Sequence, residues 1–78
     1  MGTDMEIEVK LFASFRKGRW LSKCLSFDEE VIIKDILKTL SIDENEIGMI
    51  LINGTYKKID TPLKDGDILA IFPPVAGG

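Results

Sequence analysis

Apolar and polar side chains alternate near the start of the chain, in Glu6–Ala13 (EIEVKLFA). A period of two with one apolar side is typical of a β-strand that buries one face. The apolar side consists of Ile7, Val9 and Leu11, which we expect in the core. The same alternation places Phe12 on the opposite, more polar side. The pattern therefore predicts a half-buried strand with an aromatic residue facing away from the core.

A second strand is predicted in Trp20–Phe27, after the basic segment Ser14–Arg19, which we interpret as a solvated loop. Two strands joined by a short loop favour a β-hairpin. Cys24 falls on the same side of this strand as Trp20, and we interpret Trp20 as a packing residue near the edge of the sheet. The other side is apolar and is predicted to share one face of the strand: Leu21, Leu25 and Phe27.

The apolar period lengthens in Val31–Leu40, where it fits an α-helix. Apolar residues spaced i, i+3, i+4 and i+7 form one stripe along a helix, and this stripe is the predicted buried face. Asp28 is the predicted N-cap, because a carboxylate there can accept hydrogen bonds from the first turn. The polar segment Ser41–Glu46 ends the helix. The stripe comprises Ile33, Ile36, Leu37 and Leu40.

Two further strands, Gly48–Ile52 and Thr55–Ile59, are predicted on either side of the dipeptide Asn53-Gly54. Asn-Gly accepts a positive φ at both central positions of a two-residue turn, and it is therefore a strong hairpin signal. The sequence predicts a tight antiparallel pair of strands after the helix.

The last predicted strand is Ile68–Phe72, which follows a turn at residues 65–67 (DGD). Its alternation places Phe72 on the side away from the predicted core. The strand ends at Pro73-Pro74, because proline lacks the N–H that a sheet ladder needs and restricts the residue before it.

The predicted order is strand, strand, helix, strand, strand, strand, which favours an α+β domain. We expect a mixed sheet of about five strands with one main helix packed on one face. This order is that of the ubiquitin-like β-grasp fold. We divide the chain into a leader at residues 1–5, a β-grasp domain at residues 6–72 and an extended C-terminal tail at residues 73–78.

Composition limits the chemistry that such a domain can perform by itself. The chain has 78 residues, 10 basic and 13 acidic side chains, no histidine, one cysteine and a formal net charge of −3. It therefore has no ordinary general base near pH 7, no internal disulfide and no set of side chains for a thiolate or imidazole metal site. The mild acidity argues against a nucleic-acid partner. No apolar run approaches the roughly 20 residues that span a membrane, and we expect a cytoplasmic protein.

The last seven residues, FPPVAGG, form an unusual chain end. Pro73 and Pro74 make a stiff, extended exit from the last strand. Gly77 and Gly78 carry no side chains, so this tail could enter a narrow channel and bring its carboxylate close to another protein's site. The alternative is a frayed terminus of small residues. The position of Gly-Gly behind a rigid Pro-Pro favours the functional interpretation.

Three segments of the chain resemble a known family. The stretch LKDGDILAIFPPVAGG at residues 63–78 is similar to the small subunit of molybdopterin synthase. The segment VKLFASFR at residues 9–16 and the tripeptide Ile52-Asn53-Gly54 fit the same family. The resemblance extends from about Glu6 to Gly78; its DGD-to-FPPVAGG part is specific, and the rest is shared with other ubiquitin-like sulfur carriers.

The resemblance implies a mechanism centred on Gly78. An E1-like activating enzyme would use ATP to adenylate the Gly78 carboxylate, and sulfur from a persulfide donor would then displace AMP. The resulting thiocarboxylate would enter the large subunit of molybdopterin synthase and donate sulfur to cyclic pyranopterin monophosphate. The carrier would bind no cofactor, since ATP is used by the activating enzyme and the sulfur is held covalently.

The resemblance also implies a partner-binding face. Apolar contacts would be made by Phe12, Tyr56 and Phe72, and a basic contact near the tail by Arg16. Tyr56 departs from the aliphatic residue that the family tends to have there. The alternative is that the aromatic residues belong to the core. The tail itself would contribute the remaining contacts through Pro73, Pro74, Val75 and Ala76, while Gly77 belongs with Gly78 to the reactive end.

Three other functions stay open. The protein could carry sulfur to the thiazole of thiamine, or it could be a ubiquitin-like modifier joined to lysines through Gly78. It could also be an interaction module with an inert tail. Cys24 is interpreted as a bystander, because a reactive thiol needs a cationic neighbour or a helix N-terminus and its strand neighbour Lys23 would point to the opposite face.

Overall fold

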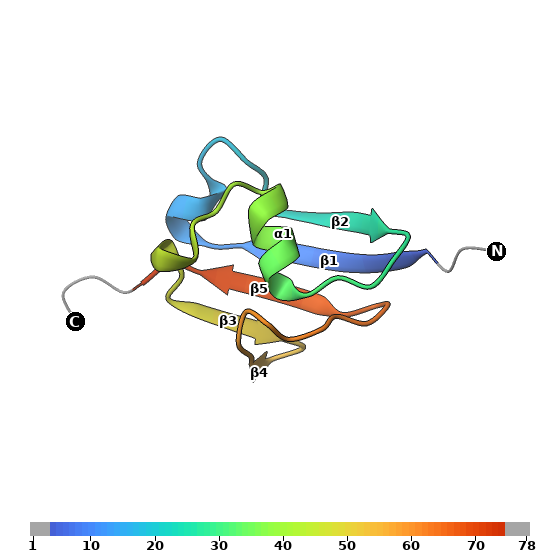
Figure 1. Cartoon of the computed structure of the whole chain (residues 1–78). Helices are drawn as coiled ribbons and strands as arrows, with labels where there is room; N and C mark the ends of the chain where they lie inside the picture. The colour runs from blue at the N-terminus through green and yellow to red at the C-terminus, as the bar shows by residue number, and fades with distance from the viewer. Residues whose placement is uncertain (1–3, 75–78) are drawn as a thin grey trace.

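The computed structural model describes residues 4–74, and these form a mixed five-stranded sheet with a helix across one face (Figure 1). The strand order is β2-β1-β5-β3-β4. The two central strands, β1 and β5, are parallel, and every other neighbouring pair is antiparallel. The elements are β1 (Met5–Leu11), β2 (Ser22–Phe27), α1 (Ile33–Thr39), β3 (Met49–Ile52), β4 (Thr55–Tyr56) and β5 (Ile68–Phe72), with short 3₁₀ helices η1 (Ala13–Arg16) and η2 (Glu44–Glu46). The predicted ubiquitin-like β-grasp fold is confirmed.

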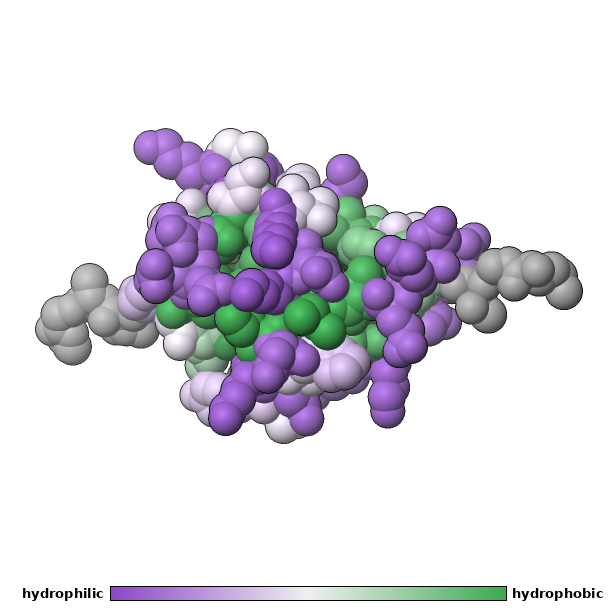
Figure 2. Space-filling view, in the orientation of Figure 1, coloured by the Kyte–Doolittle hydropathy of each residue, from purple (hydrophilic) through white to green (hydrophobic). Residues whose placement is uncertain are grey.

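The core lies between the sheet and α1, as the alternation predicts. Ile7, Val9 and Leu11 of β1 are fully buried, and so are Leu69 and Ile71 of β5. The helix contributes its apolar stripe, while hydrophilic side chains cover much of the surface on the α1 side of the molecule (Figure 2). The other buried residues are Phe15, Val31, Ile33, Ile36, Leu37, Ile42, Ile50, Ile52 and Leu63.

The connection from β1 to β2 keeps its basic residues exposed, as predicted, but it contains a short helix and a buried aromatic residue. β1 ends at Leu11, two residues early, because Ala13 adopts a φ of 53° that a strand cannot continue. The chain then turns through η1 and buries Phe15 in the core. β2 starts only at Ser22, two residues later than predicted, so Leu21 lies before the strand and is 60% exposed.

The helix begins at Ile33, and the predicted N-cap at Asp28 is wrong. Val31 and Ile32 are extended instead, because they pair with the segment around Pro62: Ile32 forms a β-bridge with Pro62. The N–H of Ile32 donates to the Asp35 carboxylate at 3.0 Å, which caps the first turn from within the helix. Tertiary pairing has therefore replaced the first turn that the apolar pattern predicts.

The Asn53-Gly54 turn forms as predicted, with φ values of 52° and 87°, both positive as a type I′ hairpin requires. β4 is shorter than the predicted Thr55–Ile59. The carbonyl of Ile59 accepts from the N–H of Lys34 at 2.8 Å, so the chain leaves the sheet to satisfy the N-terminal turn of α1. No helix within residues 4–74 is long and apolar enough to cross a membrane.

Asp67 fastens the start of β5 to this hairpin. Its carboxylate accepts from the backbone N–H of Lys64 at 2.8 Å and from the side-chain amide of Asn53 at 3.0 Å, and Asn53 in turn accepts from the N–H of Ile68. We expect Asp67→Ala to lower the free energy of unfolding by about 1–2 kcal/mol, because the substitution strands several hydrogen-bonding groups.

Chemical denaturation of purified protein checks this expectation. The matched control is Asp28→Ala, an exposed acidic residue before the helix, for which a change below about 0.5 kcal/mol is expected. Equal effects of the two substitutions would contradict the role of Asp67.

Candidate functional site

The face of the sheet opposite α1 carries a continuous set of apolar side chains, which we call the outer face. It is built by the residues of β5 and β3 that alternate with the core positions, together with Phe12, which directly follows β1, and Tyr56 of β4, which pairs with Leu51. In a β-sheet, directly paired residues point to the same side. The outer face comprises Phe12, Met49, Leu51, Tyr56, Ile68, Ala70 and Phe72.

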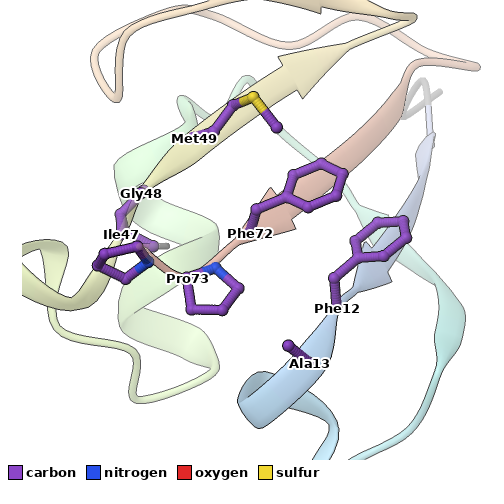
Figure 3. A pocket seen from close by; sticks show the side chains of 8 residues that line it. Phe12, Ala13, Ile47, Gly48, Met49, Phe72 and Pro73 are labelled. Carbon is purple, nitrogen blue, oxygen red and sulfur yellow. The ribbon is translucent and has the colours of Figure 1, made fainter. Parts of the chain in front are cut away.

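Phe12 and Phe72 form the centre of the site. Their rings stack with centroids 4.1 Å apart and an interplanar angle of 11°, and they lie side by side in Figure 3. Both residues are half-buried, so the sequence-based placement away from the core is confirmed and the core alternative is wrong for this pair. Because β1 and β5 are parallel neighbours, the adjacency follows from the register Leu11–Ile71.

Arg16 adds positive charge beside the aromatic pair. Its Nε donates to the Leu11 carbonyl at 2.7 Å, which fixes the guanidinium group with Cζ 5.2 Å from the Phe12 ring centroid. A guanidinium group over an aromatic ring is a favourable cation–π arrangement. The remaining N–H groups of Arg16 are donors suited to a carboxylate, and the residue is exposed. The sequence-based grouping of Arg16 with Phe12 and Phe72 is reproduced by the geometry.

Tyr56 lies on the same face but at the edge of the sheet. It is 72% exposed and pairs with Leu51, one strand further from β5 than Met49 and Leu51. On the opposite side of the face, β1 presents Glu8 and Lys10, which are 4.0 Å apart as an exposed ion pair. Exposed pairs of this kind contribute little to stability. The outer face is therefore apolar over β5, β3 and β4 and charged over β1.

The tail leaves the sheet beside this aromatic pair. An open, mainly apolar groove of about 680 Å³ surrounds the exit. The Gly48 N–H donates to the Phe72 carbonyl at 2.8 Å, and Pro73 is half-buried. The groove is lined by Phe12, Ala13, Ile47, Gly48, Met49, Phe72, Pro73 and Pro74.

Sequence reasoning missed Ile47, Gly48 and Met49 in this groove. Met49 could have been found from the alternation in β3, which places it outward beside Phe72. No sequence pattern connects Gly48 with the prolines, because Pro73 lies 25 positions later in the chain (73 − 48). The predicted site residues Val75, Ala76, Gly77 and Gly78 lie outside the described residues. Cys24 is exposed on β2, opposite Glu8.

The mixed five-stranded sheet, its single-sided helix and an aromatic face beside the C-terminal exit define the class of ubiquitin-like β-grasp proteins. A model of the ThiS family matches residues 9–78. The chain therefore belongs to the ThiS family, the ubiquitin-like sulfur carriers and modifiers.

Three relatives illustrate the range of this family. Small archaeal modifier protein 3 of Haloferax volcanii is 30% identical over 95% of this chain and 100% of its own length. The structure of a putative molybdopterin converting factor subunit 1 from Pyrococcus furiosus is 28% identical, with a TM-score of 0.74 over 91% of this chain and 99% of that chain. A complex of subunits 1 and 2 of the molybdopterin-converting factor from Helicobacter pylori includes a chain that is 26% identical, with a TM-score of 0.59 over 95% of this chain and 100% of that chain.

Proposed function

We propose that this protein carries sulfur for molybdopterin synthesis, as the small subunit of a molybdopterin synthase of the molybdenum or tungsten cofactor pathway. One observation carries the proposal: the Phe12–Phe72 stack lies at the point where Pro73 leaves the sheet. A partner that docks on the outer face would thus meet the tail at the same place. Likeness to molybdopterin converting factor subunit 1 supports this assignment.

The chemistry proceeds at the Gly78 carboxylate. A carboxylate is a poor electrophile, so an E1-like activating enzyme first joins it to the α-phosphate of ATP and pyrophosphate leaves. A persulfide sulfur then attacks the acyl carbon and AMP leaves, after which a thiol reduces the sulfur–sulfur bond and frees the thiocarboxylate. The carrier contributes no general base, and its role is to present a nucleophilic sulfur at the end of a short tail.

The second step takes place in the large subunit of the synthase. The outer face docks on this partner through its aromatic pair, while Arg16 pairs with a partner carboxylate. The residues Pro73–Gly78 enter the partner's channel, where small side chains permit close approach of the backbone. Sulfur is transferred to cyclic pyranopterin monophosphate, and two loaded carriers build one dithiolene. We propose that this takes place in the cytoplasm.

A second candidate function is protein modification. The likeness to small archaeal modifier protein 3 favours it, and the first chemical step would be the same acyl adenylate at Gly78. A lysine amine would then attack the acyl carbon in place of sulfur, AMP would leave, and an isopeptide bond would join Gly78 to the target. Trypsin cleaves after Lys64, so it would leave residues 65–78 on such a lysine; this remnant on other proteins in the source cells, absent when Gly78 is deleted, would support modification over sulfur transfer.

Intact-mass spectrometry tests the carrier function. After incubation with an activating enzyme, ATP and a persulfide source, we expect the mass to rise by the difference between one sulfur and one oxygen atom. Omission of ATP should prevent the gain, because the carboxylate would not be activated. No gain with any cognate activating enzyme would overturn the proposal. Co-purification of a thiazole synthase in place of a synthase large subunit would redirect it to the thiamine branch.

A further inference from the structure

Among the glycines in residues 4–74, Gly48 is the one where backbone atoms of Pro73 and Pro74 occupy the space that a side chain would need. A Cβ atom added to it would lie 2.5 Å from the Pro73 carbonyl oxygen and 2.6 Å from both the Pro73 carbonyl carbon and the Pro74 Cα. These are backbone atoms, which cannot rotate away as the end of a side chain can. A methyl group at position 48 and the observed path of Pro73-Pro74 are therefore incompatible.

The other described glycines are present for a different reason. Gly18, Gly54 and Gly66 have φ values of 73°, 87° and 88°, and an added Cβ would meet nothing within 4 Å. They supply the positive φ of turns. Gly48 has no such φ, and its lack of a side chain matters only for the close approach of another segment. This difference indicates that the requirement for glycine at position 48 comes from the packing of the tail and not from the conformation of a local turn.

The same residue also holds the tail by its backbone. The Gly48 N–H donates to the Phe72 carbonyl at 2.8 Å, immediately before Pro73. Neither proline can donate to the sheet, so this hydrogen bond is the last described one between β5 and its neighbour β3 within residues 4–74. Each proline fixes its own φ, and Pro74 also restricts Pro73 before it, so a displacement at Pro73 is not absorbed at Pro74.

We propose that Gly48 is a positioning residue that sets the direction in which the tail leaves the sheet and thereby presents Gly78 to the enzymes that act on it. This inference rests on the proposed carrier function. Gly78 is the fourth residue after Pro74, a span of at most about 14 Å. A change in the direction of Pro73-Pro74 therefore changes the positions that the Gly78 carboxylate can occupy, while the outer face that recognises the partner stays in place.

Gly48→Ala tests the inference in the thiocarboxylation assay. We expect kcat/KM of the activating enzyme for the carrier to fall by about tenfold or more, mainly in kcat, because misplacement of a reacting group by roughly 1 Å can cost ~100-fold. The matched control is Gly18→Ala, which strains a turn at φ 73° but lies away from the prolines. It should lower the melting temperature and leave kcat unchanged. A Gly48→Ala variant with wild-type kcat would overturn the proposal.

A spectroscopic measurement keeps the geometry separate from the activity. In wild-type protein, NMR should detect nuclear Overhauser contacts between the Gly48 Hα protons and the Hα of Pro74, and Gly48→Ala should lose them while core contacts of Ile50 and Ile71 persist. Their absence in the wild type would overturn the inference even if the carrier is loaded normally. Failure of the wild type to be loaded, with these contacts present, would instead refute the proposed function.

Discussion

Deletion of Gly77 and Gly78 is expected to abolish sulfur loading, with a loss below the detection limit of intact-mass spectrometry. In the proposed function the acyl adenylate forms on the carboxylate of Gly78, and a chain that ends at Ala76 would present its carboxylate two residues short of the activating site. The methyl group of Ala76 would also hinder the close backbone approach that glycine permits. Loading of the truncated chain at the wild-type rate would show that the sulfur is not carried at Gly78.

The same deletion should leave the fold intact. Within residues 4–74, the fourteen buried apolar residues lie from Ile7 to Ile71, so the truncation removes none of these. A surface change within about 0.5 kcal/mol shifts the melting temperature of a domain of this size by roughly 2–4 °C. A much larger shift, measured by calorimetry, would mean that the truncation had unfolded the carrier. Addition of one alanine after Gly78 is the matched control for position, because it keeps every residue yet should block loading equally.

Phe72→Ala is expected to weaken binding to a synthase large subunit roughly 30-fold, the change that follows from about 2 kcal/mol for a central aromatic anchor. Phe72 stacks on Phe12 and lies beside the exit of the tail. Its removal would both shrink the apolar contact and free the Phe12 ring. Titration calorimetry with the purified partner measures the change in Kd.

Two further variants sharpen this test. Lys38→Ala removes an exposed side chain of α1, on the opposite side of the sheet from the outer face, and it should leave Kd unchanged. Phe12→Ala should weaken binding by a similar factor to Phe72→Ala, and the double variant by less than the product, because the two rings act as one stacked unit. Full multiplicativity, or an unchanged Kd for Phe72→Ala, would contradict the role assigned to the stack.

The strands β1, β3 and β5 could be predicted from the sequence because each has one buried side. In β1, the alternation of apolar and polar residues identified Ile7, Val9 and Leu11 as core and set Phe12 apart, and in β5 the parity set Phe72 apart. The Asn53-Gly54 turn could be predicted because its chemistry permits positive φ at both positions. Both features depend on residues that are close together in the sequence and not on contacts between distant segments.

The connections could not be predicted in this way, since their shape depends on segments far along the chain. The sequence favoured a helix from Val31, but pairing of Ile32 with Pro62 keeps the first residues extended. It favoured a strand to Ile59, but the backbone of that segment serves the start of α1. It favoured a solvated loop before β2, but Phe15 fills the core there. In each case a hydrogen bond or a packing contact outweighed a local preference.

In the candidate site, too, some features follow from the sequence and others follow only from the tertiary structure. The sequence by itself determined that Phe12 and Phe72 face outward and that a Pro-Pro-led tail ends in Gly-Gly. Only the tertiary structure decided that the two rings stack, because this requires β1 and β5 to be parallel neighbours in one register. Only the tertiary structure brought Gly48 against Pro73, because contact between distant segments is fixed by the pairing of β3 with β5 and not by any pattern along the chain.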